Sequence, residues 1–144
     1  RTATKNNTMK SNALADIHGR SFITPRPWSE AEFDELLLKD STFLISGENS
    51  FLLGMLTDYE AEILTLAVDP MKRRLGIAKK MLDEFEDRCL EKKINKIILE
   101  VAKNNNPALK LYESCNFEIT GKRRDYYSSP EGIKIDAIIM TKSI

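Results

Sequence analysis

The segment at residues 68–79, VDPMKRRLGIAK, constrains the fold of this sequence more than any other. It follows an almost wholly apolar run at 63–68 and precedes a long amphipathic stretch, so we expect a strand, a turn and a helix. Asp69-Pro70 ends the strand, because proline has no N–H for a ladder and restricts the residue before it. A strand that is apolar on both faces suits the centre of a sheet that other elements cover on both sides.

The start of the predicted helix has the features of an anion site. The first N–H groups of a helix have no partner within it, and the helix dipole places positive charge there. Gly76 and Ala78 are small enough to let a ligand approach the backbone, and four basic residues add to the field: Lys72, Arg73, Arg74 and Lys79. This pattern predicts a pyrophosphate site; the alternative is that the two small residues only allow close packing of the helix on a sheet. The segment is neither a Walker loop nor a dinucleotide fingerprint, because it lacks Gly-Lys-Ser/Thr and a third glycine.

The composition indicates one globular domain over residues 1–144 without a global electrostatic role. The chain has 144 residues, 42% of them hydrophobic and 31% charged, which is enough for a single core. Lysine plus arginine equals aspartate plus glutamate at 22 each, so no overall field favours nucleic acid or an anionic membrane. We find neither a membrane-length apolar run nor a signal-peptide core and expect a cytoplasmic protein.

The few cysteines and histidines predict no metal site. Cys89 and Cys115 fall on apolar faces of predicted helices and are expected to be reduced core residues. His18 is the one histidine, so a zinc site is not expected, and we assign it a structural role.

The elements predicted along the chain give a mixed α/β fold. Ser29 with Glu32 forms a capping box that opens one helix, and Asn-Asn-Asn-Pro at 104–107 opens another that ends near residue 116. Further helices are expected at 11–21 and 74–93, and strands at 42–46, 51–57, 61–68, 94–102, 117–124 and 133–141, with a first strand at 2–9. Residues 126–132 are expected to join the last two strands.

Glu100 stands inside the otherwise apolar strand at 94–102. A carboxylate there has to be neutralised, paired or turned toward a wet cleft, because burying it bare costs many kcal/mol. The strand alone leaves two readings open: a general base in a cleft, or an ion pair with a lysine or arginine at a strand end.

The turn at 73–78, RRLGIA, resembles the (Arg/Gln)-x-x-Gly-x-(Gly/Ala) turn of the GNAT acyltransferases, and the order of elements is that of the GNAT fold. Within that superfamily the chain resembles the RimI group, bacterial enzymes that acetylate the N-terminal alanine of a small-subunit ribosomal protein. The matching blocks are LAVDP at 66–70, LEV at 99–101, ALKLYES at 108–114, RRDYY at 123–127 and DAIIM at 136–140. Ala78 stands for the usual second glycine, and Cys115-Asn116 for the usual Leu-Gly, which leaves the proposed chemistry untouched.

The resemblance implies a mostly antiparallel central sheet with helices on both faces, and direct transfer of acetyl from acetyl-CoA to a primary amine. It implies Glu100 as the general base, acting through a water, and Tyr112 as the general acid for the departing CoA thiolate; for Tyr112 the alternative is a tyrosine that only fills the core. A protein α-amine has a pKa of about 8, so a modest base suffices. A phenol of pKa about 10 can protonate a thiolate of pKa about 8.5.

The resemblance also implies the binding residues. The backbone of Leu66, Ala67 and Val68 would hold the pantetheine arm, whose amides mimic a strand partner, so we expect a splayed or bulged strand there. The pyrophosphate would lie on Arg73, Arg74, Leu75, Gly76, Ile77, Ala78 and Lys79, with Asn105 touching a further part of the cofactor. Tyr126 and Tyr127 would wall the acceptor cleft; the alternative for them is a pair of solvent-exposed turn residues.

The implied partner is the N-terminal peptide of a ribosomal protein, bound by a monomer or weak dimer with no nucleic acid, membrane or metal. Two alternatives stay open. One is acetylation of a small polyamine or antibiotic, which would favour an acidic cleft, whereas the hairpin here is basic at 122–124. The other is a non-catalytic acetyl-CoA-binding module, which the presence of both Glu100 and Tyr112 disfavours.

Overall fold

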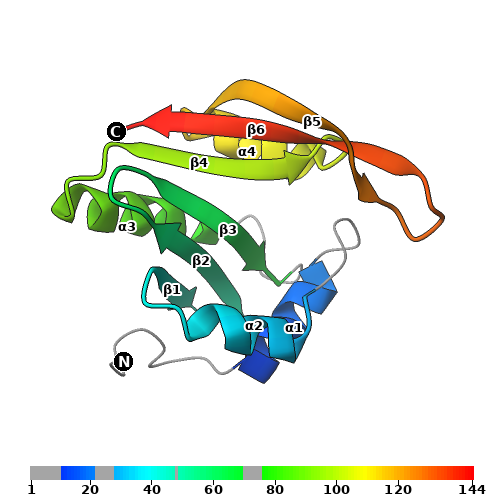
Figure 1. Ribbon diagram of the computed structural model, residues 1–144, viewed down its shortest axis with the longest axis horizontal. Coiled ribbons are helices and arrows are strands. Elements are labelled where there is room, and N and C mark those ends of the chain that lie inside the picture. Colours follow the sequence, from blue (N-terminus) through cyan, green and yellow to red (C-terminus); the bar gives the residue numbers. More distant parts are fainter. Residues whose placement is uncertain (1–10, 22–27, 48, 70–75) are drawn as a thin grey trace.

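The computed structural model describes residues 11–21, 28–47, 49–69 and 76–144 (Figure 1). Its elements in chain order are α1 (Ser11–Ser21), α2 (Glu30–Leu37), β1 (Thr42–Gly47), β2 (Ser50–Leu56), β3 (Ala61–Val68), α3 (Ile77–Glu91), β4 (Lys96–Ala102), α4 (Asn106–Ser114), β5 (Glu118–Ser128) and β6 (Lys134–Ser143). The first strand expected at 2–9 lies outside the described residues.

The described strands form a six-stranded mixed sheet in the order β1-β2-β3-β4-β6-β5. Only β3 and β4 pair in parallel; every other neighbouring pair is antiparallel. A parallel pair needs a long crossover, and α3 supplies it between β3 and β4. The predicted fold class, a mostly antiparallel sheet within a mixed α/β domain, is confirmed.

Helices cover both faces of the sheet, as predicted (Figure 1). On one face, Met81 and Phe85 of α3 pack with sheet residues such as Leu99 in the larger core cluster. On the other, Leu14 of α1 and Phe33 of α2 pack against sheet residues of the smaller cluster. Burial of each such side chain contributes about 1.5–3 kcal/mol, so both layers hold the sheet in place.

Several predictions made from local sequence patterns are confirmed. α1 has the predicted bounds, and the capping box of α2 is present: Glu32 N–H donates to Ser29 Oγ at 3.2 Å, and Ser29 N–H donates to Glu32 Oε1 at 2.9 Å. The cysteine prediction is also confirmed, since Cys89 and Cys115 are both buried and form no disulfide. Within the described ranges, no helix has the length and apolar character needed to cross a bilayer.

The last hairpin differs from the prediction. The expected connection at 126–132 is shorter, because β5 continues to Ser128 and holds Tyr126 and Tyr127 within the strand. The register explains the error: Arg123 pairs with Ala137 and Tyr127 with Ile135, so three residues of β5 face Asp136 alone. Such a bulge interrupts the alternation by which strands are recognised in a sequence.

Candidate active site

Strands β3 and β4 separate part-way along their length. They pair only where residues 61–63 meet 97–99, so the remainder of β3 has no ladder with β4. On its other side β3 carries a bulge, since Leu53 pairs with Thr65 while Gly54 pairs with Ile63, which leaves Leu64 extra. The splayed and bulged strand that the resemblance implied is therefore present, with the β4-facing backbone groups of residues 64–68 outside any strand pairing.

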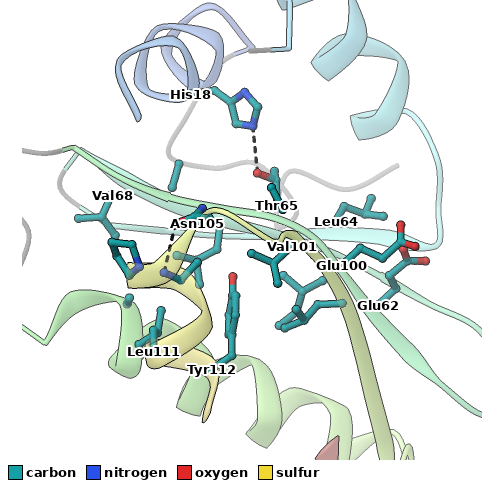
Figure 2. Close-up of a pocket in the computed structure, with 18 of the residues that line it drawn as sticks. His18, Glu62, Leu64, Thr65, Val68, Glu100, Val101, Asn105, Leu111 and Tyr112 are labelled. Carbon is teal, nitrogen blue, oxygen red and sulfur yellow. Dashed lines mark hydrogen bonds between the residues drawn. The ribbon is translucent and has the colours of Figure 1, made fainter. Parts of the chain in front are cut away.

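A cavity of about 820 Å³ lies at this splay, with a lining drawn from β3, α3, β4, α4 and β5 (Figure 2). It brings together every described residue that the sequence assigned to the site: Leu66, Ala67, Val68, Gly76, Ile77, Ala78, Lys79, Glu100, Asn105, Tyr112, Tyr126 and Tyr127. The other three, Arg73, Arg74 and Leu75, lie outside the described residues.

One end of the cavity is the start of α3. Gly76 is the N-cap residue in a left-handed conformation, with φ +73°, and it gives the helix no side-chain cap. The first turn holds no acidic residue. The only described counter-charge beside Lys79 is Asp83, an exposed pair at 3.6 Å that weakens the local field little. The first N–H groups of α3, which follow Gly76 and have no side-chain cap, fit a phosphate group.

Asn105 has a structural duty at the start of α4. Its Oδ1 accepts a hydrogen bond from Ala108 N–H at 3.2 Å, which caps the helix (Figure 2). The cap uses the side-chain oxygen and does not use the amide NH₂ donors. The residue type is therefore explained by helix capping alone, and its place in the cavity lining adds the capacity to donate to a ligand.

Tyr112 projects from α4 with its hydroxyl directed at the sheet (Figure 2). The residue is 7% exposed, and its ring packs edge-on against Phe117 at 5.7 Å. Burial, with a smaller contribution from Cys115, raises the pKa of Tyr112 well above its ordinary value. Desolvation disfavours the phenolate, so the hydroxyl keeps its proton at neutral pH.

Glu100 faces the cavity from β4 and is also paired. Arg123 Nε of β5 lies 2.5 Å from Glu100 Oε2. That oxygen is buried, and no donor among the described residues makes a well-directed hydrogen bond to it. The ion-pair reading is therefore confirmed, and Glu100 also lines the cavity, which is the position that the general-base reading requires.

Glu62 of β3 was not singled out from the sequence, yet it stands beside Glu100 (Figure 2). Burial raises the pKa of Glu62, and the charges of Glu100 and Glu60 raise it further, while Arg123 lowers it. The signal that drew attention to Glu100, a carboxylate within an apolar strand, was also present at Glu62.

Tyr126 and Tyr127 line the cavity at the bulge that β5 forms over residues 124–126. The bulge is fixed by Asp125, whose φ is +54° and whose N–H donates to Asp136 Oδ1 at 2.9 Å. The two tyrosine rings meet edge-on at 5.1 Å, and the Arg123 guanidinium lies 5.1 Å from the ring of Tyr126. Tyr126 is 52% exposed but lines the cavity, so it is a strand residue at the cavity mouth. Burial raises the pKa of Tyr127 to about 12.

Comparison with protein families matches residues 12–117 to the acetyltransferase (GNAT) family. The chain belongs to this family. It is 31% identical over 146 aligned residues to the [ribosomal protein bS18]-alanine N-acetyltransferase of Escherichia coli strain K12, covering 96% of this chain and 98% of that one. The resemblance to GNAT acyltransferases of the RimI group is thereby confirmed.

Solved structures agree with the GNAT assignment. The ribosomal-protein-S18-alanine N-acetyltransferase from Escherichia coli superposes with a TM-score of 0.81 at 29% identity, covering 93% of this chain and 87% of that one. Arabidopsis thaliana NAA60, solved in complex with acetyl-CoA, superposes with a TM-score of 0.76 at 21% identity, covering 93% and 94%. At that lower identity the second match supports the fold alone.

His18 is buried and hydrogen-bonded, as the structural role expected from the sequence requires. His18 is 1% exposed; its Nδ1 accepts from Trp28 N–H at 2.9 Å, and its Nε2 lies 3.0 Å from Thr65 Oγ1. An Nδ1 that accepts leaves the proton on Nε2, which donates to Thr65. Burial lowers the pKa of His18 to about 4, so the ring is neutral at physiological pH. It also lines the cavity and ties α1 to the splayed part of β3.

Proposed function

We propose that this GNAT domain transfers the acetyl group of acetyl-CoA to the α-amine of an N-terminal alanine on a ribosomal protein. The observation that carries the proposal is that one cavity joins the uncapped start of α3 to two carboxylates and three tyrosines. A relative that aligns along almost its whole length is named for this reaction on ribosomal protein bS18.

The residues present fit acetyl-CoA. The unpaired edge of β3 at residues 64–68 offers backbone N–H and C=O groups to the two amides of a pantetheine arm. The uncapped start of α3 offers N–H groups to the pyrophosphate, and Asn105 offers its amide donors. Acetyl-CoA supplies the acetyl group as a thioester.

Glu100 and Tyr112 divide the proton transfers in this proposal. Glu100 accepts the proton that the amine nitrogen loses as it attacks, and a water between the two fits that role. Tyr112 donates its proton to the sulfur that leaves; its place in the cavity lining, with the hydroxyl directed at the sheet, supports this assignment. Tyr126 and Tyr127 form the wall along which the acceptor backbone lies.

One observation favours a second candidate, acetylation of a small polyamine. The cavity presents two carboxylates, Glu62 and Glu100, and a polycationic acceptor suits an acidic cleft. The basic Arg123 that pairs with Glu100 weighs against it, because it cancels part of that charge.

Free-thiol release from acetyl-CoA with two acceptors separates these functions. One acceptor is a short peptide with an alanine N-terminus taken from the ribosomal protein, and the other is spermidine. We expect turnover on the peptide and little on spermidine. Turnover on spermidine alone would replace the acceptor while keeping the enzyme class, and silence on both with acetyl-CoA bound would favour a binding module.

A further inference from the structure

The two carboxylates at the acceptor end of the cavity have different surroundings. Glu100 lies against the Arg123 guanidinium, at 2.5 Å from Oε2 to Nε, with its side chain 22% exposed. Glu62 has no ion-pair partner among the described residues, although it is half-buried at the same end of the cavity. Within the described part of the chain, one carboxylate is thus held in an ion pair and the other is not.

An acceptor amine has two protons to lose. A protein α-amine of pKa about 8 arrives mainly as an ammonium at neutral pH. It must lose one proton before its lone pair can attack the thioester carbon, and a second once the C–N bond has formed. A site with one carboxylate leaves the first of these transfers to bulk water.

We propose that Glu62 is a second catalytic carboxylate, which binds the acceptor as an ammonium and takes its first proton, while Glu100 takes the second proton after attack. This inference rests on the proposed function, because it concerns the acceptor of that same reaction. It assigns the acceptor class as a primary ammonium group presented without a neighbouring counter-charge.

The step balances without any further reactant. The nitrogen bonds to the acetyl carbon and the carbon–sulfur bond breaks, with Tyr112 giving its proton to the sulfur. Of the two protons taken by Glu62 and Glu100, one returns to Tyr112 and the other leaves to solvent. An ammonium and a thioester thus become an amide, a thiol and one free proton.

The groups around Glu62 suit a proton acceptor. From β4 it faces Glu100, from β5 Arg123, and from the turn before β3 Glu60, which pairs with Lys96 at 3.3 Å. Two of these charges are negative, and together with burial they raise the pKa of Glu62, which brings it nearer to that of the amine. On the neighbouring strand β2, the register partner of Glu62 is Met55, which adds no charge.

The test compares Glu62→Gln with Glu100→Gln over a range of pH, using kcat/KM for the acceptor that the wild-type protein turns over. At about pH 6.5 only about 3% of an α-amine is neutral, so a variant limited to that fraction loses about 30-fold. Near pH 9 the amine is already neutral, and the deficit of Glu62→Gln should shrink to about twofold. The deficit of Glu100→Gln should persist at both pH values.

A matched control and a rescue make the result specific. Glu118→Gln removes an exposed carboxylate at the far end of β5, outside the cavity, and should keep the wild-type profile, while Glu62→Asp should restore most of the lost activity. Equal loss for Glu62→Gln at every pH, or no loss at all, would overturn the inference while leaving the proposed function intact.

A binding measurement covers the case in which turnover is absent. With CoA bound, the wild-type protein should prefer a free-amine peptide to its N-acetylated form at about pH 6.5, and Glu62→Gln should abolish that preference. An unchanged preference in the variant would overturn the role of Glu62. Absence of acetyl transfer by the wild-type protein, on the other hand, would count against the proposed function.

Discussion

The two ends of the cavity are built in different ways. At the α3 end the contacts are backbone groups: an unpaired strand edge at 64–68 and the first N–H groups of a helix that starts at a left-handed glycine. At the β5 end they are side chains that come from separate strands, Glu62 from β3, Glu100 from β4 and Arg123 from β5. A backbone site tolerates many side chains, whereas a site built of side chains, such as the proposed acceptor end, changes its chemistry with one substitution. Cofactor binding and acceptor choice can therefore vary independently in such a fold.

The largest expected effect comes from acid, which should disable both ends together. His18 has a pKa of about 4 when folded, lowered from 6.5 by burial, so the unfolded chain binds the extra proton first. The contribution of neutral His18 to the free energy of unfolding is fully present above about pH 6.5. It falls by about 3 kcal/mol as the pH drops to about 4. Urea midpoints at several pH values measure this. His18→Asn should flatten that part of the profile, and an unchanged slope would contradict it.

Tyr112→Phe should lower the rate of acetyl transfer and leave binding at both ends of the cavity intact. We expect turnover to fall about 100-fold, because general acid catalysis contributes that order of rate. Acetyl-CoA affinity should stay within about twofold, since the ring still packs against Phe117. Steady-state turnover and direct titration with acetyl-CoA give the two values. Full turnover in the variant would remove Tyr112 as the acid.

Gly76→Ala should weaken the α3 end alone. A non-glycine residue at φ +73° costs about 1–2 kcal/mol, which shifts the turn and raises the Kd for acetyl-CoA about tenfold. Gly132→Ala is a matched control, because Gly132 has φ +86° in the hairpin turn and does not line the cavity. An equal loss of affinity in both variants would mean that general strain, and not the helix start, is being measured.

Asp136→Ala should weaken the β5 end alone and has the smallest expected effect. It removes the acceptor of the Asp125 N–H bond that fixes the bulge, worth about 1 kcal/mol in this exposed place. We expect the peptide KM to rise about threefold with acetyl-CoA affinity unchanged. Glu118→Ala, at the far end of β5, serves as the control. A rise in the Kd for acetyl-CoA would show that the two ends are coupled.

The same contrast explains what the sequence predicted. The strand Ala61–Val68 and the capping box at Ser29 are local patterns, so they could be located from neighbouring residues alone. The partner of Glu100 is 23 residues away on another strand, and no local pattern links Glu100 to Arg123. Tyr126 was assigned to a turn because the bulge that places it in β5 depends on Asp136, a contact across the hairpin.

The bulge in β5 also bears on how the protein behaves at high concentration. β5 lies at the end of the described sheet, and a flat outer strand is a template on which a second chain can add hydrogen bonds. Three consecutive residues without strand partners of their own interrupt that template, and Lys122 before them adds repelling charge. Flattening this strand to alter acceptor choice would therefore also promote self-association, and variants at Asp125 or Asp136 should be screened for aggregation before their kinetics are compared.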